Sequence, residues 1–310
     1  MARRTPLTVS HPERVIYEAA GVTKGDVVAH YQRVAPRMLD FMAGRPLTLQ
    51  RFPRGIGAPG FMQKNAAGHF PASIGRYAVP KQDGGTTTYP VVTDAEDVAY
   101  LANQGTLTFH MWLSRTDAPE RPDWLVLDLD PEDGDVAGAR HATAAMRDLL
   151  AEFDVAAFPV ATGSKGFHVW VPLAPGPGDQ DVATVARALA ELAAIRDPER
   201  LTVEFLKRER RGRVFVDWLR NTPGATVVVP FSLRPTAVAS VAVPLTWDEL
   251  ATAQPAGWRI GAIDDRLTVA TDLAPQRLPV DAIVAAAREA GADLETTVDR
   301  FGRRTERGPR

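Results

Sequence analysis

The sequence has no cysteine, no apolar run long enough to span a membrane, and almost no net charge. Without cysteine there are no disulfides and no cysteine-ligated zinc site. The lack of a long apolar segment or a signal-like N-terminal stretch argues against a membrane association and favours the cytoplasm. A net charge of −2 excludes a polycation, so any binding to nucleic acid, in the nucleoid for example, must depend on a local basic patch.

The overall composition is that of an ordinary globular protein. The chain has 310 residues, of which 45% are hydrophobic and 24% are charged. This length can bury a sizeable core, as one large domain or as two subdomains. No internal repeat of fixed period is present.

Residues 124–130, Trp-Leu-Val-Leu-Asp-Leu-Asp, form the stretch around which the chain is organised. The short apolar run closed by Pro131 predicts a buried strand. Side chains alternate along a strand, so Asp128 and Asp130 are expected on one face and the leucines on the other. Two neighbouring carboxylates near a strand end need a positive partner, most simply a divalent cation. The alternative is an exposed strand end with two solvated acids.

A third acid follows a basic cluster later in the chain. Five of the seven residues 207–213 are Lys or Arg, and they lead into the apolar strand expected at 214–218. Charge clusters usually lie on solvated faces, so the cluster alone indicates little. Asp217 lies inside the apolar strand and needs a partner there, which a metal held by Asp128 and Asp130 would provide.

A glycine-rich turn is expected between two strands at 162–168, Thr-Gly-Ser-Lys-Gly-Phe-His. Such a turn presents backbone N–H groups, a hydroxyl and an ammonium to one point, which suits phosphate oxygens. Gly-Ser-Lys-Gly also occurs in ordinary hairpins. Periodicity predicts further strands and helices around this turn. The strands are expected at 46–52, 106–112 and 226–230, a hairpin at 75–92 with its turn at 83–85, and helices at 94–104, 136–152, from 178 to about 195, near 247–250 and at 280–291.

Near the N-terminus, Thr23 is expected to cap a helix whose first turn contains Lys24. A cation is unfavourable at the positive end of a helix dipole unless an anion is bound there, and helix N-termini bind phosphate. The alternative is a solvated lysine. Further on, Phe61 and Met62 follow a flexible loop and precede Lys64 and Asn65. They suit either a stacking platform for a nucleobase with a phosphate contact nearby, or the core.

Taken together, these pieces resemble the archaeo-eukaryotic primase superfamily, most closely the polymerase domain of bacterial ligase D. The resemblance covers nearly the whole chain and rests on an ordered set of motifs. The motifs are Lys24 in a Thr-Lys turn, Arg51-Phe52-Pro53, Pro59-Gly60-Phe61-Met62-Gln63-Lys64, Gly85-Thr86-Thr87-Thr88-Tyr89-Pro90, Asp128-Leu129-Asp130-Pro131, Phe158-Pro159-Val160, Gly163-Ser164-Lys165-Gly166-Phe167-His168, Val214-Phe215-Val216-Asp217-Trp218 and Ser232-Leu233-Arg234.

The resemblance implies an α+β fold, a primase-polymerase core of mixed, largely antiparallel sheets flanked by helices. It also implies template-directed nucleotide addition at DNA gaps and broken ends, a preference for ribonucleotides, and Mn²⁺ or Mg²⁺ as cofactor. A single catalytic domain is expected over 1–300. DNA-end and template contacts are expected within about 1–110, the catalytic core within about 110–240, and a basic disordered tail at 301–310.

The resemblance assigns site residues by position. The catalytic metal ligands are Asp128, Asp130 and Asp217. The nucleoside triphosphate contacts are His110, Thr162, Ser164, Lys165, His168, Arg234 and Arg51. The DNA contacts are Arg14 and Lys24 at a downstream 5′-phosphate, Phe61 and Met62 as the template-stacking wedge, and Lys64, Asn65 and Arg210.

Three positions depart from the family pattern. Met62 stands where relatives have a second phenylalanine and weakens stacking. Thr162 stands where they have serine and keeps the hydroxyl. Gln50 stands where a lysine is common and removes one cation. Because no ligase or nuclease motif follows, a stand-alone polymerase is expected, with a separate DNA ligase and end-binding protein as partners.

Two other functions compete with this reading. An apolar strand that ends in Asp-x-Asp also opens haloacid-dehalogenase-like phosphatases, where Thr162, Lys165 and the pair Asp264-Asp265 would complete the site. The phosphatase assignment leaves Asp217 without a role. In that fold the Asp-x-Asp motif usually comes first, whereas here more than a hundred residues precede it. The other alternative is a non-catalytic protein that bridges DNA ends, against which the three intact acids argue.

Overall fold

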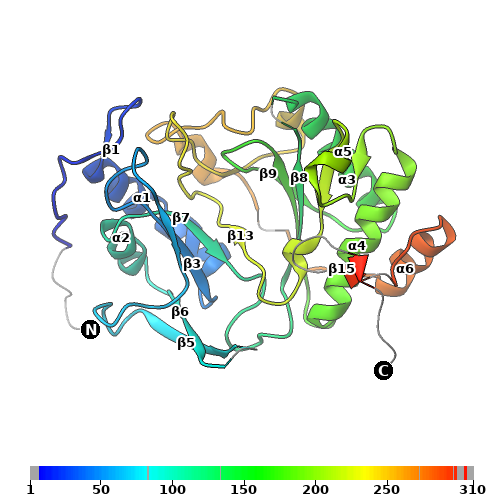
Figure 1. Cartoon of the computed structure of the whole chain (residues 1–310), viewed down its shortest axis with the longest axis horizontal. Helices are drawn as coiled ribbons and strands as arrows, with labels where there is room; N and C mark the ends of the chain where they lie inside the picture. The colour runs from blue at the N-terminus through cyan, green and yellow to red at the C-terminus, as the bar shows by residue number, and fades with distance from the viewer. Residues whose placement is uncertain are drawn as a thin grey trace. The chain divides into compact units, whose positions relative to one another are not determined.

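The computed structural model divides the chain into two compact units (Figure 1), each assembled from three stretches of sequence. The structure describes residues 7–81, 84–132, 134–271 and 273–295, together with the backbone of 297–298 and 304–305. Unit 1 comprises Met1–Asp117, Thr226–Val243 and Ala256–Thr268, and unit 2 comprises Ala118–Ala225, Pro244–Pro255 and Val269–Arg310.

Unit 1 is built on a four-stranded sheet with the strand order β13-β7-β3-β4, in which all neighbours are antiparallel. Two smaller antiparallel pairs, β1-β2 and β5-β6, accompany it. The strands are β1 (Val15–Tyr17), β2 (Val22–Thr23), β3 (Leu47–Arg51), β4 (Phe61–Gln63), β5 (Gly75–Pro80), β6 (Thr86–Val91), β7 (Thr106–Met111) and β13 (Val227–Val228). The helices are α1 (Lys24–Met42), α2 (Ala95–Asn103) and the 3₁₀ turn η3 (Asp264–Thr268).

Helix α1 starts where the sequence predicts. Thr23 and Asp26 form a capping box, in which the Thr23 hydroxyl accepts from the Asp26 N–H and the Asp26 carboxylate accepts from the Thr23 N–H. Apolar residues at helical spacing along it, among them Val27 and Tyr31, are buried. The cap therefore fixes the helix start and with it the position of Lys24.

Unit 2 contains a six-stranded sheet with the order β11-β12-β8-β10-β9-β14. Strand β8 is antiparallel to both of its neighbours, whereas β11 and β12 are parallel. The strands are β8 (Trp124–Asp130), β9 (Phe158–Ala161), β10 (Phe167–Pro172), β11 (Leu201–Thr202), β12 (Val214–Asp217), β14 (Val243–Pro244), β15 (Thr297–Val298) and β16 (Arg304–Thr305). The helices are α3 (Val136–Ala151), α4 (Asp179–Arg196), α5 (Lys207–Arg210), α6 (Val280–Glu289), and the 3₁₀ turns η1 (Leu219–Asn221) and η2 (Asp248–Ala251).

The core of unit 2 lies on one face of this sheet. Leu125, Leu127 and Leu129 of β8 are fully buried in one apolar cluster with residues of α3, α4 and α6. Because side chains alternate along a strand, Asp128 and Asp130 project from the opposite face. The helices therefore cover the apolar face and leave the other to the acids. We call that side of the sheet the acid face.

The predicted α+β class with antiparallel sheets is confirmed, and most predicted elements appear within a residue or two. The strand predicted at 226–230 is shorter, since only Val227 and Val228 pair as β13. Asp83 of the predicted hairpin turn lies outside the described residues. So does the predicted tail, apart from Arg304–Thr305, which pair with Thr297–Val298. Within the described ranges, no helix is both long and apolar enough to cross a membrane.

We expect Gly166→Ala to disrupt the junction of β10 with β8. A Cβ atom on Gly166 would lie 1.9 Å from the Leu129 carbonyl oxygen, a backbone atom that cannot move without distorting β8. The loss of stability should be at least about 2 kcal/mol, near the upper range for overpacking. Urea unfolding measures it, with Gly176→Ala as the control, because a Cβ there meets nothing within 4 Å. Equal stability of the two variants would show that this close approach is absent.

Candidate active site

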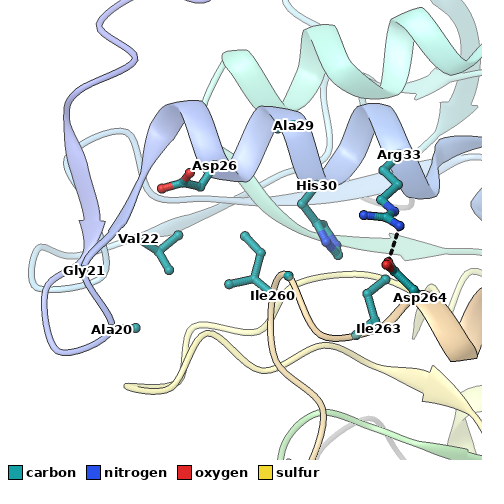
Figure 2. Close-up of a pocket in the computed structure, with 11 residues that line it drawn as sticks. Ala20, Gly21, Val22, Asp26, Ala29, His30, Arg33, Ile260, Ile263 and Asp264 are labelled. Atoms are coloured by element: carbon teal, nitrogen blue, oxygen red, sulfur yellow. Dashed lines mark ion pairs between the residues drawn. The ribbon is translucent and has the colours of Figure 1, made fainter.

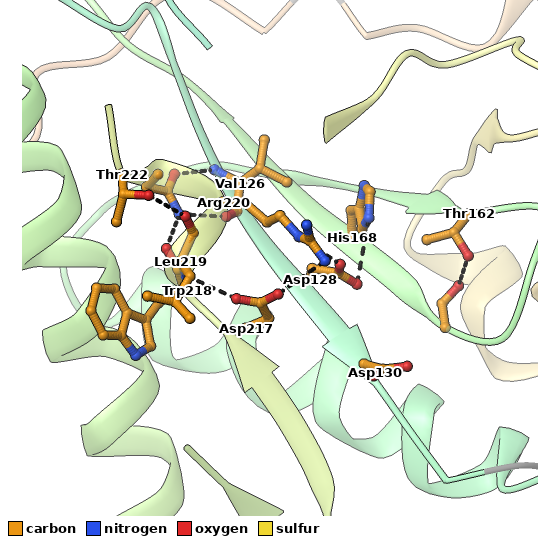
Figure 3. A network of polar contacts seen from close by, with 12 residues as sticks. Val126, Asp128, Asp130, Thr162, His168, Asp217, Trp218, Leu219, Arg220 and Thr222 are labelled. Carbon is orange, nitrogen blue, oxygen red and sulfur yellow. Dashed lines mark hydrogen bonds and ion pairs between the residues drawn. The ribbon is translucent and has the colours of Figure 1, made fainter. Parts of the chain in front are cut away.

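The sheet register aligns three site residues in one row across the acid face. On β12, Asp217 lies opposite Asp128 of β8, and on β10, His168 lies opposite the same Asp128. Asp130 lies two residues further along β8, on the same side. Figure 3 shows the Asp217, Asp128 and His168 side chains converging from three neighbouring strands. The structure thus brings together residues that lie far apart in the sequence.

Burial decreases from Asp217 to Asp130. The side chains are 8% exposed for Asp217, 17% for Asp128 and 38% for Asp130. Carboxylates this close and this buried repel each other and lose hydration, so they need positive partners.

The partner of the two most buried acids is Arg220, a residue that the sequence analysis did not single out. Its Nε lies 3.2 Å from Asp128 Oδ2, and its Nη2 lies 3.1 Å from Asp217 Oδ2. On the other side of Asp128, His168 Nε2 lies 3.5 Å from Oδ1. The only sequence signal was an arginine three residues after Asp217, just beyond the strand end.

The least buried acid has its own arginine. Arg210 Nη1 lies 2.9 Å from Asp130 Oδ2, and the same guanidinium donates to the carbonyls of Glu204 and Phe205. The Arg210 side chain is buried and lies over the Phe215 ring. Its predicted contact with DNA stays a prediction, and in this structure the guanidinium is held by protein groups.

The environment shifts the pKa values of the two central acids in opposite directions. Burial raises the pKa of Asp217 to about 6, reinforced by Asp128 and only partly opposed by Arg220. Burial also tends to raise the pKa of Asp128, but His168 and Arg220 outweigh it and hold that pKa below its ordinary value. Asp128 is therefore the firmly ionised member of the pair, and Asp217 is the one whose charge is costly.

The predicted phosphate-binding turn lies between β9 and β10, as expected. The Thr162 hydroxyl donates to the Gly166 carbonyl at 2.8 Å and closes the turn, and it also accepts from the Ser164 N–H. Ser164 is half-buried and Lys165 is exposed at the tip. On the following strand, His168 Nδ1 is buried and has no hydrogen-bond partner among the described residues. The turn and His168 therefore offer donor groups beside the acid row.

Two predicted contacts for a 5′-phosphate lie in unit 1. Lys24 is buried rather than solvated, and its Nζ donates to the Ser10 hydroxyl at 2.7 Å. Burial and then the nearby Arg14 cation lower the pKa of Lys24. Arg14 is exposed and donates from Nη1 to the Pro53 carbonyl. The two cations thus lie near each other at the start of α1.

The predicted template wedge is on the surface of unit 1. Phe61 is 48% exposed and Met62 is 50% exposed, so neither is a core residue. Arg51 lies with its guanidinium over the Phe61 ring and donates to the Gln104 carbonyl. Lys64 and Asn65 follow on the same surface, and the Asn65 side chain accepts from the Thr88 N–H.

The remaining predicted nucleotide contacts, His110 and Arg234, also belong to unit 1. His110 is half-buried on β7, between Thr48 of β3 and Val228 of β13 in the register. Arg234 is half-buried after β13, and its backbone carbonyl accepts from the Tyr17 hydroxyl. Their predicted roles at the triphosphate stay predictions.

A cavity of about 430 Å³ in unit 1 contains none of the site residues that the primase resemblance assigns (Figure 2). It lies between α1 and residues 260–264. Its charged groups are paired within the wall, since Arg33 binds Asp264 at 2.5 Å and Asp26 is used in the helix cap. Burial lowers the pKa of His30 to about 4, so this histidine is neutral and bonds to the Phe231 carbonyl. The cavity therefore offers no unpaired charge for a phosphate.

The acid face has the ligands that a hard cation needs, and in this structure its carboxylates form ion pairs with Arg210 and Arg220. Carboxylate oxygens are the ligands that Mg²⁺ and Mn²⁺ prefer. Asp128 and Asp217 are direct neighbours in the register, which is close enough to share one ion. As arranged, however, no group of three or more His, Asp or Glu in the described part of the chain could hold a metal ion. The donor set fits, and the side chains must rearrange to use it.

Comparison with known families separates the polymerase from the phosphatase considered above. The family model of the LigD primase-polymerase domain matches residues 23–274, most of the chain and every predicted site residue except Arg14. The chain belongs to this family. The family consists of polymerases, which are nucleotidyltransferases, and membership in it removes the grounds for the phosphatase alternative.

Individual relatives agree with the family match. The chain is similar to the polymerase domain of Mycobacterium tuberculosis ligase D, whose structure was solved in complex with DNA, with 32% identity and a TM-score of 0.75. This similarity covers 94% of our chain and 98% of that one. Our chain is also 33% identical over 276 residues to the multifunctional non-homologous end joining protein LigD of Mycolicibacterium smegmatis. This match covers 88% of our chain and 36% of that protein. The LigD of Pseudomonas aeruginosa is 34% identical, with 84% and 31% covered. The chain thus spans about a third of the length of these two proteins.

We expect Asp217→Asn to stabilise this primase-polymerase fold in a chelating buffer at pH 8. The folded protein binds the Asp217 proton with a pKa of about 6, above that of the unfolded chain, so ionised Asp217 destabilises the fold above that pH. The gain should be about 2–3 kcal/mol at pH 8, should decline below pH 6 and should vanish near pH 4.

Thermal unfolding at several pH values measures this effect. Asp148→Asn is the control, because that carboxylate is 66% exposed on α3 and its loss should change little. An Asp217→Asn protein that is no more stable than the unchanged protein at pH 8 would contradict the assigned strain at this acid.

Proposed function

We propose that this protein is a template-directed polymerase that adds nucleotides at DNA gaps and broken ends. The observation that supports it most is the row of Asp217, Asp128 and His168 across three neighbouring strands in a member of the primase-polymerase family. A phosphoryl-transfer site needs concentrated negative ligands for cations beside donors for phosphate oxygens. The acid face and the adjoining glycine turn have both.

In this proposal, Asp128, Asp130 and Asp217 hold Mn²⁺ or Mg²⁺. In a two-metal mechanism, one bound cation would lower the pKa of the primer 3′-hydroxyl and the other would neutralise the departing pyrophosphate. Asp128 and Asp217 contribute from adjacent strands, and Asp130 contributes from the more exposed end of β8. Because the strands fix their backbones, the carboxylates need only side-chain rotations to face a common ion.

The glycine turn and His168 would bind the triphosphate of the incoming nucleotide. Lys165 is exposed at the tip of the turn and can reach a phosphate oxygen as a point charge. Ser164 adds a hydroxyl, and His168 has a buried nitrogen, Nδ1, for which the described residues provide no hydrogen-bond partner. The Thr162 hydroxyl closes the turn and shapes it for the ligand. We propose further contacts from His110, Arg51 and Arg234, and a preference for ribonucleotides.

The surface of unit 1 would bind the DNA. Phe61 and Met62 are large, adjacent and half-exposed, which suits stacking on a template base. Lys24 and Arg14 are two neighbouring cations whose repulsion an anion would relieve, and we propose the 5′-phosphate at the far side of a gap as that anion. Lys64 and Asn65 would add contacts next to the wedge.

We place the activity in DNA end joining or short-gap filling. The relatives from Mycolicibacterium smegmatis and Pseudomonas aeruginosa are named as non-homologous end joining proteins. A polymerase acting there would hand its product to a DNA ligase and would work beside a protein that binds DNA ends.

The test is nucleotide addition to a labelled primer that faces a one-nucleotide gap with a downstream 5′-phosphate, with Mn²⁺ present. We expect addition of the complementary nucleotide only, more from ribonucleotides than from deoxynucleotides, and less on a gap that ends in a 5′-hydroxyl. Asp217→Ala should reduce the rate of addition by more than ~100-fold. That factor is typical for loss of a group that only hydrogen-bonds to a metal ligand, and Asp217 is proposed to be a ligand itself. DNA binding by this variant should be nearly unchanged, because the substitution removes a metal ligand and no side chain that contacts a DNA phosphate.

Asp148→Ala serves as the matched control for this assay, since it removes an exposed carboxylate of the same unit. Addition by Asp217→Ala at the rate of the unchanged protein would contradict the assignment of the acids. Tight binding of DNA ends by the unchanged protein without any nucleotide addition would favour the non-catalytic bridging function instead.

A further inference from the structure

Arg220 joins the two most buried carboxylates of the acid face with one side chain. Its Nε and Nη2 reach Asp128 Oδ2 and Asp217 Oδ2 at 3.2 and 3.1 Å, so a single guanidinium spans both strands (Figure 3). This arginine thus lies against the oxygen atoms that the proposed function assigns to the catalytic cation, and the following inference rests on that proposal.

Every oxygen of the two carboxylates has a partner. Besides the two oxygens that Arg220 contacts, Asp217 Oδ1 accepts from the Leu219 backbone N–H at 2.9 Å. Asp128 Oδ1 faces His168 Nε2 at 3.5 Å. Of these partners, one is a backbone group and one is a buried ring on a central strand. Only the Arg220 side chain can leave without rearranging the sheet.

The backbone that carries Arg220 is fixed to β8. The Asn221 side chain accepts from the Val126 N–H at 2.9 Å, and it donates to the carbonyls of Val126 and Trp218. Asn221 thereby satisfies the backbone N–H and C=O of Val126, which lies beyond the residues of β8 that pair with β12. Because the 3₁₀ turn is anchored in this way, a movement of Arg220 must be a rotation of its side chain.

Such a rotation is open to Arg220. Its side chain is 44% exposed, in contrast to the buried Arg210 beside Asp130. A guanidinium that turns outward regains hydration, and its flexible stem leaves the backbone in place. The carboxylates that it leaves need another cation at once, because both are largely buried.

We propose that Arg220 is an internal counter-ion that competes with the divalent cation for Asp128 and Asp217. In the metal-free protein the guanidinium neutralises the two acids and keeps them together. A divalent cation binds only when Arg220 rotates away. The net binding free energy of the metal is therefore its own interaction with the two carboxylates minus the interaction that the guanidinium gives up. Arg220 is therefore a positioning residue that holds the acids and sets the metal concentration at which the site fills.

The experiment is a titration of the chelator-treated protein, residues 1–310, with Mn²⁺, in which electron paramagnetic resonance reports free Mn²⁺. We expect Arg220→Gln to bind Mn²⁺ roughly 10-fold more tightly, about 1.4 kcal/mol, because the competitor is gone. Arg220→Lys should lie between the two, since one ammonium keeps the charge but lacks the fork that spans both carboxylates. Arg196→Gln should match the unchanged protein, because that arginine pairs with Glu152 on the surface of the same unit.

The unfolding temperature gives a second readout that does not depend on measuring free Mn²⁺. Without metal, Arg220→Gln should unfold at a lower temperature than the unchanged protein, because the two carboxylates lose their counter-ion. Added Mn²⁺ should raise its unfolding temperature by more than it raises that of the unchanged protein. A purely structural ion pair would give the first effect without the second.

The outcomes separate this inference from the proposed function. If Asp217→Ala binds Mn²⁺ as the unchanged protein does, the acids are not the metal site and the proposed function fails. If Mn²⁺ binding depends on Asp217 but Arg220→Gln binds Mn²⁺ no more tightly than the unchanged protein, the metal site stands and the competition by Arg220 is refuted.

Discussion

Two carboxylates held opposite each other on adjacent buried strands, Asp128 and Asp217, impose the constraint on which the rest of the site depends. Neither can move away, because β8 is packed against the helices by its leucines and β12 is paired to it in register. The repulsion must therefore be balanced by cations and by hydrogen bonds. His168 on β10 and Arg220 after β12 provide that balance in this structure. An acid pair of this kind is destabilising for a fold and useful to an enzyme that must bind a cation.

The local part of this arrangement could be predicted from the sequence, and the tertiary part could not. The alternation of leucine and aspartate predicted the strand 124–130 and the common face of its acids, and Thr23 predicted the start of α1. The alignment of Asp217 with Asp128 depends on strand register, which no local pattern specifies. The need of a buried acid for a partner and the family resemblance predicted only that the acids share a metal. Arg220 escaped notice because a single arginine after a strand has no periodic signature.

Long basic side chains were the hardest to predict, because their partners are decided by the fold. Lys24 and Arg210 were both expected to face DNA, yet both are buried, against the Ser10 hydroxyl and the Asp130 carboxylate. Phe61 and Met62 show the reverse, since two apolar residues that could have joined the core are half-exposed. The partners of these side chains in the structure therefore follow from the fold, and the predicted contacts of Lys24, Arg210, Phe61 and Met62 with DNA stay predictions.

The most direct test of this account is a crystal structure of the protein grown with Mn²⁺, with the ion located by its anomalous scattering. The account predicts an anomalous peak within coordination distance, about 2.0–2.2 Å, of carboxylate oxygens of both Asp128 and Asp217, as expected for a small divalent ion. The Arg220 guanidinium should then have rotated away from both acids. Bound Mn²⁺ elsewhere in the protein, with Arg220 still between the two carboxylates, would contradict it.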